Sequence, residues 1–323
     1  MRVLNLSFAD SAGAAWGLSH ALNKLDGVQS INLRANNNYI NYPSHAEFRT
    51  YGESGCKQII EKADVVIFHT AIMPFYQALH LEPEKMKDKK LMVYFHGSDL
   101  RNFGNEIIKQ AQEVLGNFTV LVSTPDLLTL APEAHWMPVA RSFAEIKAKY
   151  SPSKRDQVAI DVFGATKKRI VLGHAPTNEA IKGTDKFLRP ITNVVKEMEH
   201  VEYEQIQNLP WDSCLRRLST IDVYFDQANL GAYGLAAVEA SIFNAAIFCY
   251  IEPQVSTIME AESGLKQPFI QWTDFEDLET KILGLCGNEH LRRRFGDLAN
   301  AYCRIMHDDL NVAKRFLKLA ASV

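Results

Sequence analysis

The sequence predicts an α/β protein with two doubly wound domains. At 323 residues, the chain is long for one hydrophobic core and a natural length for two. Strand-like apolar runs alternate with helical stretches almost throughout, which is typical of parallel sheets. The alternation starts again after a polar, charged stretch at 147–156. We therefore expect a first domain at 1–150, a second at 151–307, and a C-terminal helix at 308–323 that packs on the first domain.

The first domain contains five strand-like runs with helical stretches between them. The runs are Val3–Phe8, Ser30–Leu33, Val65–Thr70, Leu91–Phe95 and Thr119–Ser123. The helical stretches are Ala14–Leu25, Gly55–Lys62 and Asn105–Leu115. Several runs end in a small or polar turn, which is where open α/β sheets place their ligands.

The second domain repeats this pattern. Its strand-like runs are Arg169–Gly173, Val201–Ile206, Asp222–Phe225 and Ala245–Tyr250, and its helical stretches are Thr184–Glu199, Pro210–Ser219 and Leu235–Phe243. The stretches Asp274–Leu285 and His290–Val323 are helical and amphipathic, and we expect them to pack on an outer face or to cross back to the first domain. Two Rossmann-like domains of similar size predict a cleft between them, and such clefts are favoured ligand sites.

Composition excludes several classes of function. The chain is 47% hydrophobic and 23% charged, as folded globular proteins are. A net charge of −3 provides no basic surface for nucleic acid. The five cysteines are scattered without a C-x-x-C pair, which favours reduced thiols and a cytoplasmic location. No apolar run is long enough for an integral membrane segment, and peripheral membrane contact stays open.

The segment Tyr233–Ser241 is the most informative in the chain. Leu235, Val238 and Ile242 recur at i, i+3 and i+7, which is one face of a helix. Glu239 lies on or beside that apolar face, and a buried carboxylate needs a partner. The start of the helix offers free backbone N–H groups to an anion. The segment could therefore hold a phosphate at its start and a sugar hydroxyl one turn later.

The loop Asp10–Ala15 follows the first strand and opens a helix. Its small residues Ser11, Ala12 and Gly13 would let the backbone approach a ligand. The alternative is a plain turn in which Asp10 or Ser11 caps the helix.

The segment Phe95–Arg101 places His96, Asp99 and Arg101 at the carboxyl end of a strand, and Gly97 permits a tight turn. A histidine there can donate to a sugar hydroxyl or share a developing charge. The alternative has Asp99 capping the next helix and Arg101 pairing with Asp99.

Two further loops follow strands of the second domain. In His174–Asp185, the pair Lys182-Gly183 at a helix start can place an ammonium against a phosphate, although a surface lysine is the simpler interpretation and Thr184 or Asp185 could cap the helix. The loop Asp226–Ala232 precedes the Tyr233 helix and is a candidate lip of the same pocket.

Motifs for cofactors are missing from the sequence. There is no G-x-G-x-x-G fingerprint, which disfavours an NAD-dependent oxidoreductase or epimerase. There is no convincing Asp-x-Asp pair and no His-Glu-x-x-His, so we expect neither a metal nor another cofactor.

Together these residues resemble the GT-B glycosyltransferases of the large group 1 type, which are mostly retaining. Ile181–Asp185 resembles the family's Lys-Gly segment, and Tyr233–Ser241 resembles its Phe/Tyr-Gly-Leu…Glu-Ala-Met motif. The resemblance implies that Lys182 and the amides of Gly234 and Leu235 hold the donor diphosphate and that Glu239 binds the ribose. It makes His96, Lys182 and Glu239 the catalytic candidates. The remaining site residues that it implies are Asn178, Gly183, Gln227 and Tyr233 for the donor, and Ser11, Ala12, Gly13, Asp99 and Arg101 on the acceptor side.

The implied activity is transfer of a sugar from a nucleoside diphosphate sugar to a carbohydrate, lipid-linked or other hydroxyl acceptor, with the donor as co-substrate and no metal. One departure matters: the family often has a second glutamate eight positions before Glu239, where this chain has Gly231. Gln227 or Asp226 could stand in for it. The alternative is a catalytically weak or inactive nucleotide-sugar-binding protein of the same fold.

Overall fold

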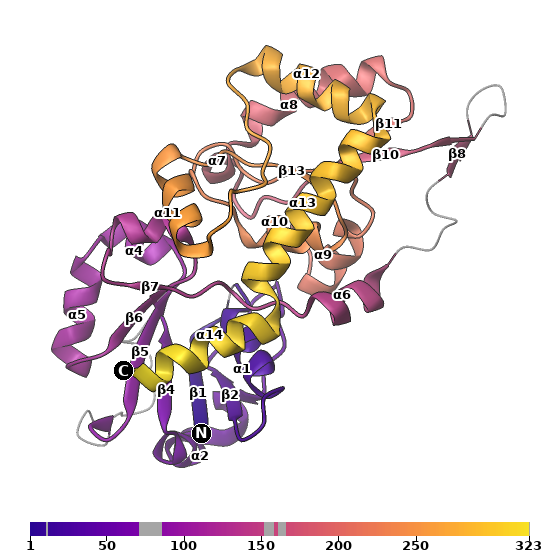
Figure 1. Cartoon of the computed structure of the whole chain (residues 1–323). Coiled ribbons are helices and arrows are strands. Elements are labelled where there is room, and N and C mark those ends of the chain that lie inside the picture. Colours follow the sequence, from indigo (N-terminus) through magenta and orange to yellow (C-terminus); the bar gives the residue numbers. More distant parts are fainter. Residues whose placement is uncertain (11, 71–85, 152–157, 161–165, 323) are drawn as a thin grey trace. The chain divides into compact units, whose positions relative to one another are not determined.

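The computed structural model describes residues 1–10, 12–70, 86–151, 158–160 and 166–322 (Figure 1). The chain divides into two compact units. Unit 1 comprises Met1–Ser142 and Met306–Val323, and unit 2 comprises Phe143–Ile305. The chain therefore leaves unit 1 once and returns to it at its C-terminal end.

Unit 1 is built on a seven-stranded sheet in which every paired strand is parallel to its neighbour. Its strands are β1 (Arg2–Ser7), β2 (Gln29–Arg34), β3 (Ala46–Glu47), β4 (Val65–His69), β5 (Lys90–Phe95), β6 (Thr119–Val122) and β7 (His135–Trp136). Their order is β3-β2-β1-β4-β5-β6-β7. The order reverses between β1 and β4, so the carboxyl ends of these two strands form the switch point of unit 1.

The helices of unit 1 include one from the far end of the sequence. They are α1 (Ala14–Leu22), α2 (Phe48–Lys62), α4 (Ser98–Phe103), α5 (Glu106–Leu115), the 3-10 helix η2 (Pro125–Thr129) and α14 (Asp309–Ser322). Helix α14 packs against α1 and buries Val312 and Phe316. The Arg141 amide donates to the His307 carbonyl at 2.8 Å, and the Asp309 amide donates to the Arg141 carbonyl at 3.1 Å. These bonds tie the C-terminal segment to unit 1.

Unit 2 has a four-stranded parallel sheet. Its strands are β10 (Ile170–His174), β11 (Val201–Gln205), β12 (Val223–Phe225) and β13 (Ala246–Phe248), in the order β11-β10-β12-β13. Strands β8 (Val158–Ile160) and β9 (Thr166–Lys168) form a separate antiparallel pair. The order reverses between β10 and β12, which makes their carboxyl ends the switch point of unit 2.

Helices and aromatic residues fill the core of unit 2. The helices are α6 (Phe143–Tyr150), α7 (Glu179–Lys182), α8 (Thr184–Glu197), α9 (Trp211–Leu218), α10 (Leu235–Ile242), α11 (Pro253–Ser263), α12 (Phe275–Gly287) and α13 (Glu289–His307), the last of which ends in unit 1. Phe225 and Phe248 stack with ring centroids 5.1 Å apart, and Phe187 packs against Phe225. All three are fully buried, so they fix the strands that carry the switch point.

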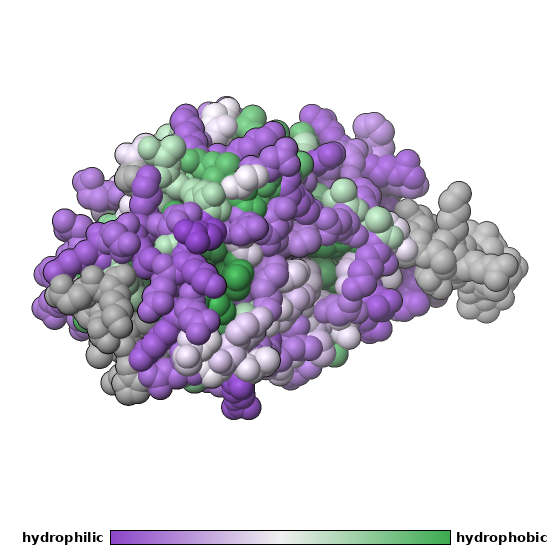
Figure 2. Space-filling view, turned by 90° about the horizontal axis from the view of Figure 1, so that it is seen from below, coloured by the Kyte–Doolittle hydropathy of each residue, from purple (hydrophilic) through white to green (hydrophobic). Residues whose placement is uncertain are grey.

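The predicted class, α/β with parallel sheets, is confirmed. The helical stretch expected over 290–323 consists of two helices that break at Asp308, and the second of them, α14, lies within the stretch 308–323 that we expected to be a C-terminal helix. Asp308 forms an isolated bridge with Arg141, and helical backbone cannot make that pairing. No helix in the described ranges is long and apolar enough to cross a membrane. The face seen in Figure 2 is mostly polar, with small apolar areas scattered over it.

Candidate functional site

At the switch point of unit 2, two of the predicted donor residues, Lys182 and Gly234, contact one buried carboxylate. Asp226 follows β12 and is 1% exposed. Its Oδ1 lies 3.0 Å from Lys182 Nζ. Its Oδ2 accepts the Gly234 N–H at 2.6 Å. The ammonium and the amide that we expected to hold a diphosphate therefore converge on an internal anion.

Lys182 reaches Asp226 because hydrogen bonds fix the backbone before and after helix α7. Asn178 caps α7, and its Oδ1 accepts the Ile181 N–H at 3.0 Å. Gly183 follows with φ 69°, a left-handed conformation that favours glycine. The Lys182 carbonyl accepts the Ala228 N–H at 2.8 Å. The Lys182 side chain is 14% exposed whereas that of Asp226 is 0%, so the lysine is the member of the pair that a ligand can reach.

Gly234 has a spatial reason to be glycine. Its φ of −97° is open to any residue. A Cβ at this position, however, would lie 2.6 Å from Lys182 Nζ and 3.2 Å from Asp226 Oδ1. Leu235 starts α10 directly after it, and its amide lies in the first turn, where helix N–H groups have no acceptor within the helix.

Glu239 lies one turn further along α10 and is buried, as its place beside the apolar face predicted. Trp211 is a partner of this carboxylate: its Nε1–H donates to Glu239 Oε1 at 2.8 Å. Trp211 is the first residue of α9. No local sequence pattern indicates this pair, because the two residues are 28 positions apart and on different helices.

Gln227 needs a correction as a donor contact. It is 0% exposed, and its amide group is used inside its own loop. Nε2 donates to the Ala232 and Tyr250 carbonyls, each at 2.7 Å, and Oε1 accepts from the amides of Asn229 and Leu230. Gln227 therefore braces the loop that ends at Gly234.

Tyr233 is buried as well and packs against Phe269 and Tyr302. Burial raises the pKa of its hydroxyl well above the usual value. Its ring contacts with Phe269 and Tyr302 anchor the residue that precedes Gly234.

The structure explains why position 231 holds a glycine where the resembled family often has a glutamate. Gly231 has φ 73°, and a Cβ there would lie 3.0 Å from Glu252 Cβ and 3.3 Å from Glu252 Oε2. The Gly231 carbonyl accepts the Glu252 N–H at 2.9 Å. The exposed side chain of Glu252 thus occupies the space beside position 231 and brings a carboxylate there from the loop between β13 and α11. Sequence reasoning missed it.

His174, at the end of β10, has a structural role. Its Nδ1–H donates to the Phe225 carbonyl at 2.6 Å, which fixes Nε2 as the acceptor for Thr184 Oγ1 at 2.8 Å. Thr184 therefore does not cap α8 with its side chain; the N-cap of α8 is Gly183.

In unit 1, the Asp10 loop adopts the capping arrangement. Asp10 Oδ1 accepts the Ala15 N–H at 3.0 Å and Oδ2 accepts the Trp16 N–H at 2.9 Å. These bonds satisfy amides in the first turn of α1, as in the capping alternative for this loop. Ser11 lies outside the described residues.

Arg141, which sequence reasoning missed, binds the same loop. Its Nη1 and Nη2 donate to the carbonyls of Gly13 and Ala12, at 3.2 and 2.8 Å. Gly13 has φ 58° and lies against the Tyr42 ring. The loop is therefore held from both sides.

The His96 segment forms a tight turn. Gly97 has φ 126°, which permits the turn, and Asp99 Oδ1 accepts the Gly97 and Leu100 amides at 3.2 and 2.9 Å. Burial raises the pKa of Asp99. Arg101 Nε donates to Asp126 Oδ2 at 2.8 Å, so its carboxylate partner is Asp126 and not Asp99.

His96 itself is joined to a second histidine. Its Nε2 lies 3.0 Å from Nδ1 of His69, the last residue of β4. His69 Nε2 lies 2.8 Å from Asn5 Oδ1 in β1. The network thus joins β1 and β4, the two strands that form the switch point, to the residue that follows β5.

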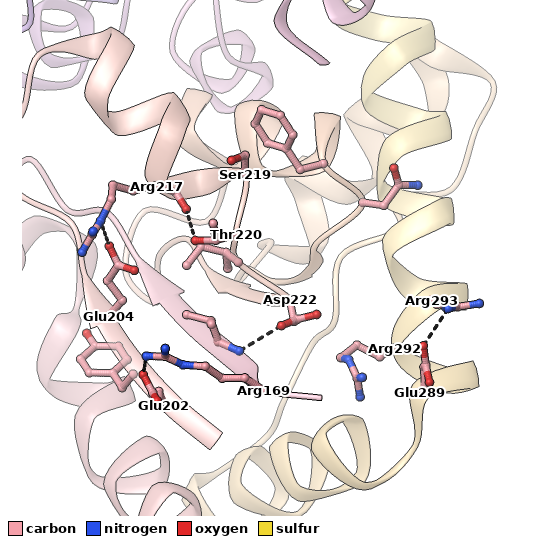
Figure 3. Close-up of a pocket in the computed structure, with 15 residues that line it drawn as sticks. Arg169, Glu202, Glu204, Arg217, Ser219, Thr220, Asp222, Glu289, Arg292 and Arg293 are labelled. Atoms are coloured by element: carbon pink, nitrogen blue, oxygen red, sulfur yellow. Dashed lines mark hydrogen bonds and ion pairs between the residues drawn. The ribbon is translucent and has the colours of Figure 1, made fainter. Parts of the chain in front are cut away.

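A pocket of about 550 Å³ lies at the opposite, amino-terminal edge of the unit 2 sheet (Figure 3). Its charged side chains largely pair with one another: Arg169 with Glu202, Arg217 with Glu204, and Arg293 with Glu289 at 2.7 Å. None of the residues that we predicted for the donor lines it.

Solved structures share this fold. HepE from Anabaena, in complex with UDP and glucose, has a TM-score of 0.67 at 12% identity, with 100% of each chain covered. A glycosyltransferase from Rickettsia africae has a TM-score of 0.61 at 12% identity, covering 99% of this chain and 98% of that one. Sucrose-phosphate synthase from Thermosynechococcus elongatus has a TM-score of 0.60 at 12% identity, covering 100% and 99%.

No protein-family model matches the sequence, and a search of curated proteins finds no match. The structural likeness confirms the fold predicted from the motifs: the chain has the GT-B fold.

Proposed function

We propose that the protein is a glycosyltransferase that moves a sugar from a nucleoside diphosphate sugar to an acceptor hydroxyl. One observation carries the proposal. Lys182 Nζ and the Gly234 N–H, from separate segments, converge on a single anion at the start of a helix. The Lys182 ammonium keeps further N–H donors for a diphosphate, and the switch point is where α/β sheets bind their ligands.

In this proposal the donor binds to unit 2. Lys182 has three N–H donors, of which Asp226 takes one, so the ammonium retains donors for a phosphate oxygen. The Leu235 amide adds a neutral donor in the first turn of α10. Glu239 Oε1 accepts from Trp211, and the Glu239 carboxylate is the acceptor that we propose for the ribose hydroxyls.

The leaving group in such a transfer carries its developing charge on the diphosphate. Lys182 and the helix amides stabilise that charge as it forms, and removing one donor of this kind costs about 3 kcal/mol in comparable sites. Asp226 keeps the ammonium and the Gly234 amide in position before the donor arrives. We extend the proposal to transfer with retention and without a metal.

Solved structures of the same fold support the choice of donor. HepE, at a TM-score of 0.67, was solved in complex with UDP and glucose, and with UDP-glucose at a TM-score of 0.64. UDP and UDP-glucose are therefore the first ligands to test. The acceptor is a carbohydrate, a lipid-linked sugar or another hydroxyl compound.

A second function, donor binding without transfer, follows from Gly231. If no carboxylate replaces the missing acid, the donor binds and does not react. Glu252 decides between the two functions, because its carboxylate is the one that the structure places beside position 231.

A thermal-shift screen with nucleoside diphosphates and their sugars tests the proposal, since a ligand that binds the native state raises its apparent stability. We expect at least one nucleoside diphosphate sugar to raise the Tm, and the same compound to be consumed when a panel of hydroxyl acceptors is added. A rise in Tm without consumption would indicate the binding-only function. No shift with any compound would contradict both.

A further inference from the structure

Asn5, His69 and His96 form a chain of side chains across three strands of unit 1. Asn5 lies in β1, His69 ends β4, and His96 follows β5. The links are Asn5 Oδ1 to His69 Nε2 at 2.8 Å and His69 Nδ1 to His96 Nε2 at 3.0 Å. Asn5 is 0% exposed and His69 is 3% exposed, so water does not compete for these bonds.

The hydrogen bonds of the Asn5 amide group show which atoms of this network donate and which accept. Its Nδ2 donates to Ser19 Oγ at 2.9 Å and to Ser30 Oγ at 3.2 Å, which leaves Oδ1 facing His69 as an acceptor. An acceptor there requires a proton on His69 Nε2. A neutral imidazole carries one proton, so His69 Nδ1 is an acceptor in turn. His96 Nε2 must then donate to it.

With the donors and acceptors assigned in this way, His96 Nδ1 is unprotonated and carries a lone pair. The atom is buried and has no hydrogen-bond partner among the residues that the structure describes. Burial lowers the pKa of His96 to about 3 and that of His69 well below its ordinary value, so both rings are neutral near pH 7. Buried acceptors are rarely left unpaired, and a ligand is one source of the missing donor.

We propose that Asn5 and His69 hold His96 as the Nε2–H tautomer, so that Nδ1 accepts a hydrogen bond from a hydroxyl group of the carbohydrate substrate. The inference rests on the proposed function for the nature of the ligand. It reverses the sequence-based expectation that His96 donates to a sugar hydroxyl. Asn5 and His69 are positioning residues, since both act through His96.

The tautomer can be read directly by NMR. In protein labelled with ¹⁵N-histidine and free of ligand, long-range ¹H–¹⁵N spectra separate protonated from unprotonated ring nitrogens. We expect a protonated Nε2 and an unprotonated Nδ1 for both His69 and His96, with His96 assigned by the loss of its signals in His96→Gln. A protonated Nδ1 on His96 would overturn the proposal. This readout needs no turnover, so it stands or falls separately from the transferase activity.

Variants of His69 test the positioning. His69→Phe keeps an aromatic ring beside Tyr94 and His96 but removes the acceptor, whereas His69→Asn puts an amide oxygen where Nδ1 was. We expect the His96 tautomers to mix in His69→Phe and the Nε2–H form to persist in His69→Asn. An Nε2–H form that persists equally in His69→Phe would show that His69 does not set it.

Titration with UDP and with UDP-glucose locates the hydroxyl. We expect UDP affinity to be the same in the wild type and in both His69 variants. If the hydroxyl belongs to the donor sugar, the gain in affinity from UDP to UDP-glucose falls about fivefold in His69→Phe, as for one neutral hydrogen bond. If it belongs to the acceptor, that gain is unchanged and the acceptor KM rises by a similar factor. A His69→Phe variant that changes neither quantity overturns the proposed contact.

Discussion

At the switch point of unit 2 a partly exposed lysine and a buried carboxylate form an ion pair, whereas the switch point of unit 1 carries two neutral imidazoles and a carboxamide. Both arrangements occupy the same place in a doubly wound sheet, where the strand order reverses. The difference lies in what each can bind. The first offers a charged donor and a helix amide to an anion, and the second offers a lone pair to a neutral hydroxyl. In our proposal, the fold determines where the ligands bind, and these few side chains determine which part of the substrate each unit binds.

Breaking the ion pair between Lys182 and Asp226 is expected to have the largest effect on the free energy of unfolding. Lys182→Ala leaves the Asp226 carboxylate buried beside the Gly234 amide with no ammonium, and breaking a buried pair in this way costs about 3–5 kcal/mol. We expect a loss of that order in the free energy of unfolding, measured with denaturant, together with weaker nucleotide binding. The exposed Lys186→Ala on α8 is the matched control and should stay within about 0.5 kcal/mol of wild type.

The double variant Lys182→Ala/Asp226→Asn separates folding from binding. It removes both charges while the Asn side-chain oxygen can still accept the Gly234 N–H. We expect most of the lost stability to return and the weak nucleotide binding to remain. A double variant as unstable as Lys182→Ala would contradict the buried-charge explanation.

A variant of Glu239 tests whether the next turn of α10 binds the ribose. Glu239→Gln keeps an oxygen for Trp211 Nε1–H but loses the charge, so folding stability should change little. We expect UDP affinity to fall roughly tenfold, the order of one hydrogen bond to a charged acceptor. Calorimetry measures this directly, and an unchanged Kd would remove Glu239 from the ribose site.

The neutral histidine pair of unit 1, His69 and His96, predicts that the free energy of unfolding depends on pH. His96 has a folded pKa of about 3, lowered by burial from an ordinary value near 6.5. The unfolded chain therefore takes up a proton as pH falls through about 6.5, while the folded chain stays neutral until about pH 3. Stability is lost on acidification across that window, with a slope approaching 1.4 kcal/mol per pH unit for this residue.

Denaturant unfolding at pH 7.5, 6 and 5 measures this slope. We expect His96→Gln to be less sensitive to acid than the wild type. The paired comparison is needed because burial also lowers the pKa of His174 and His307, which both proteins retain. Equal slopes in the two proteins would place His96 in a more polar environment than the structure gives it.

The smallest effect on stability is expected at Glu252, which is exposed. Glu252→Gln should leave folding within about 0.5 kcal/mol and UDP affinity unchanged. If Glu252 replaces the acid missing at Gly231, sugar transfer should still fall markedly. Activity equal to wild type would mean that no carboxylate is needed at this position.

Local patterns in the sequence were enough to predict the central strands of both sheets and most of the long helices. The i, i+3, i+7 spacing around Glu239 correctly indicated a helix with a buried carboxylate. The partners were not predictable. Trp211 lies 28 residues from Glu239, and His69 ends one strand while His96 follows another strand 27 residues later. Gln227 was misjudged for a similar reason: a polar residue in a loop at a strand end can bind a ligand or brace the loop, and only its hydrogen bonds distinguish the two.

The central claim is that the switch point of unit 2 binds a diphosphate. Calorimetric titration of UDP and uridine against the wild type and the Lys182→Ala/Asp226→Asn variant tests it most directly. We predict that UDP binds the wild type at least tenfold more tightly than uridine does, and that most of this ratio is lost in the double variant while uridine binding is kept. A ratio that is unchanged in the double variant would contradict the account.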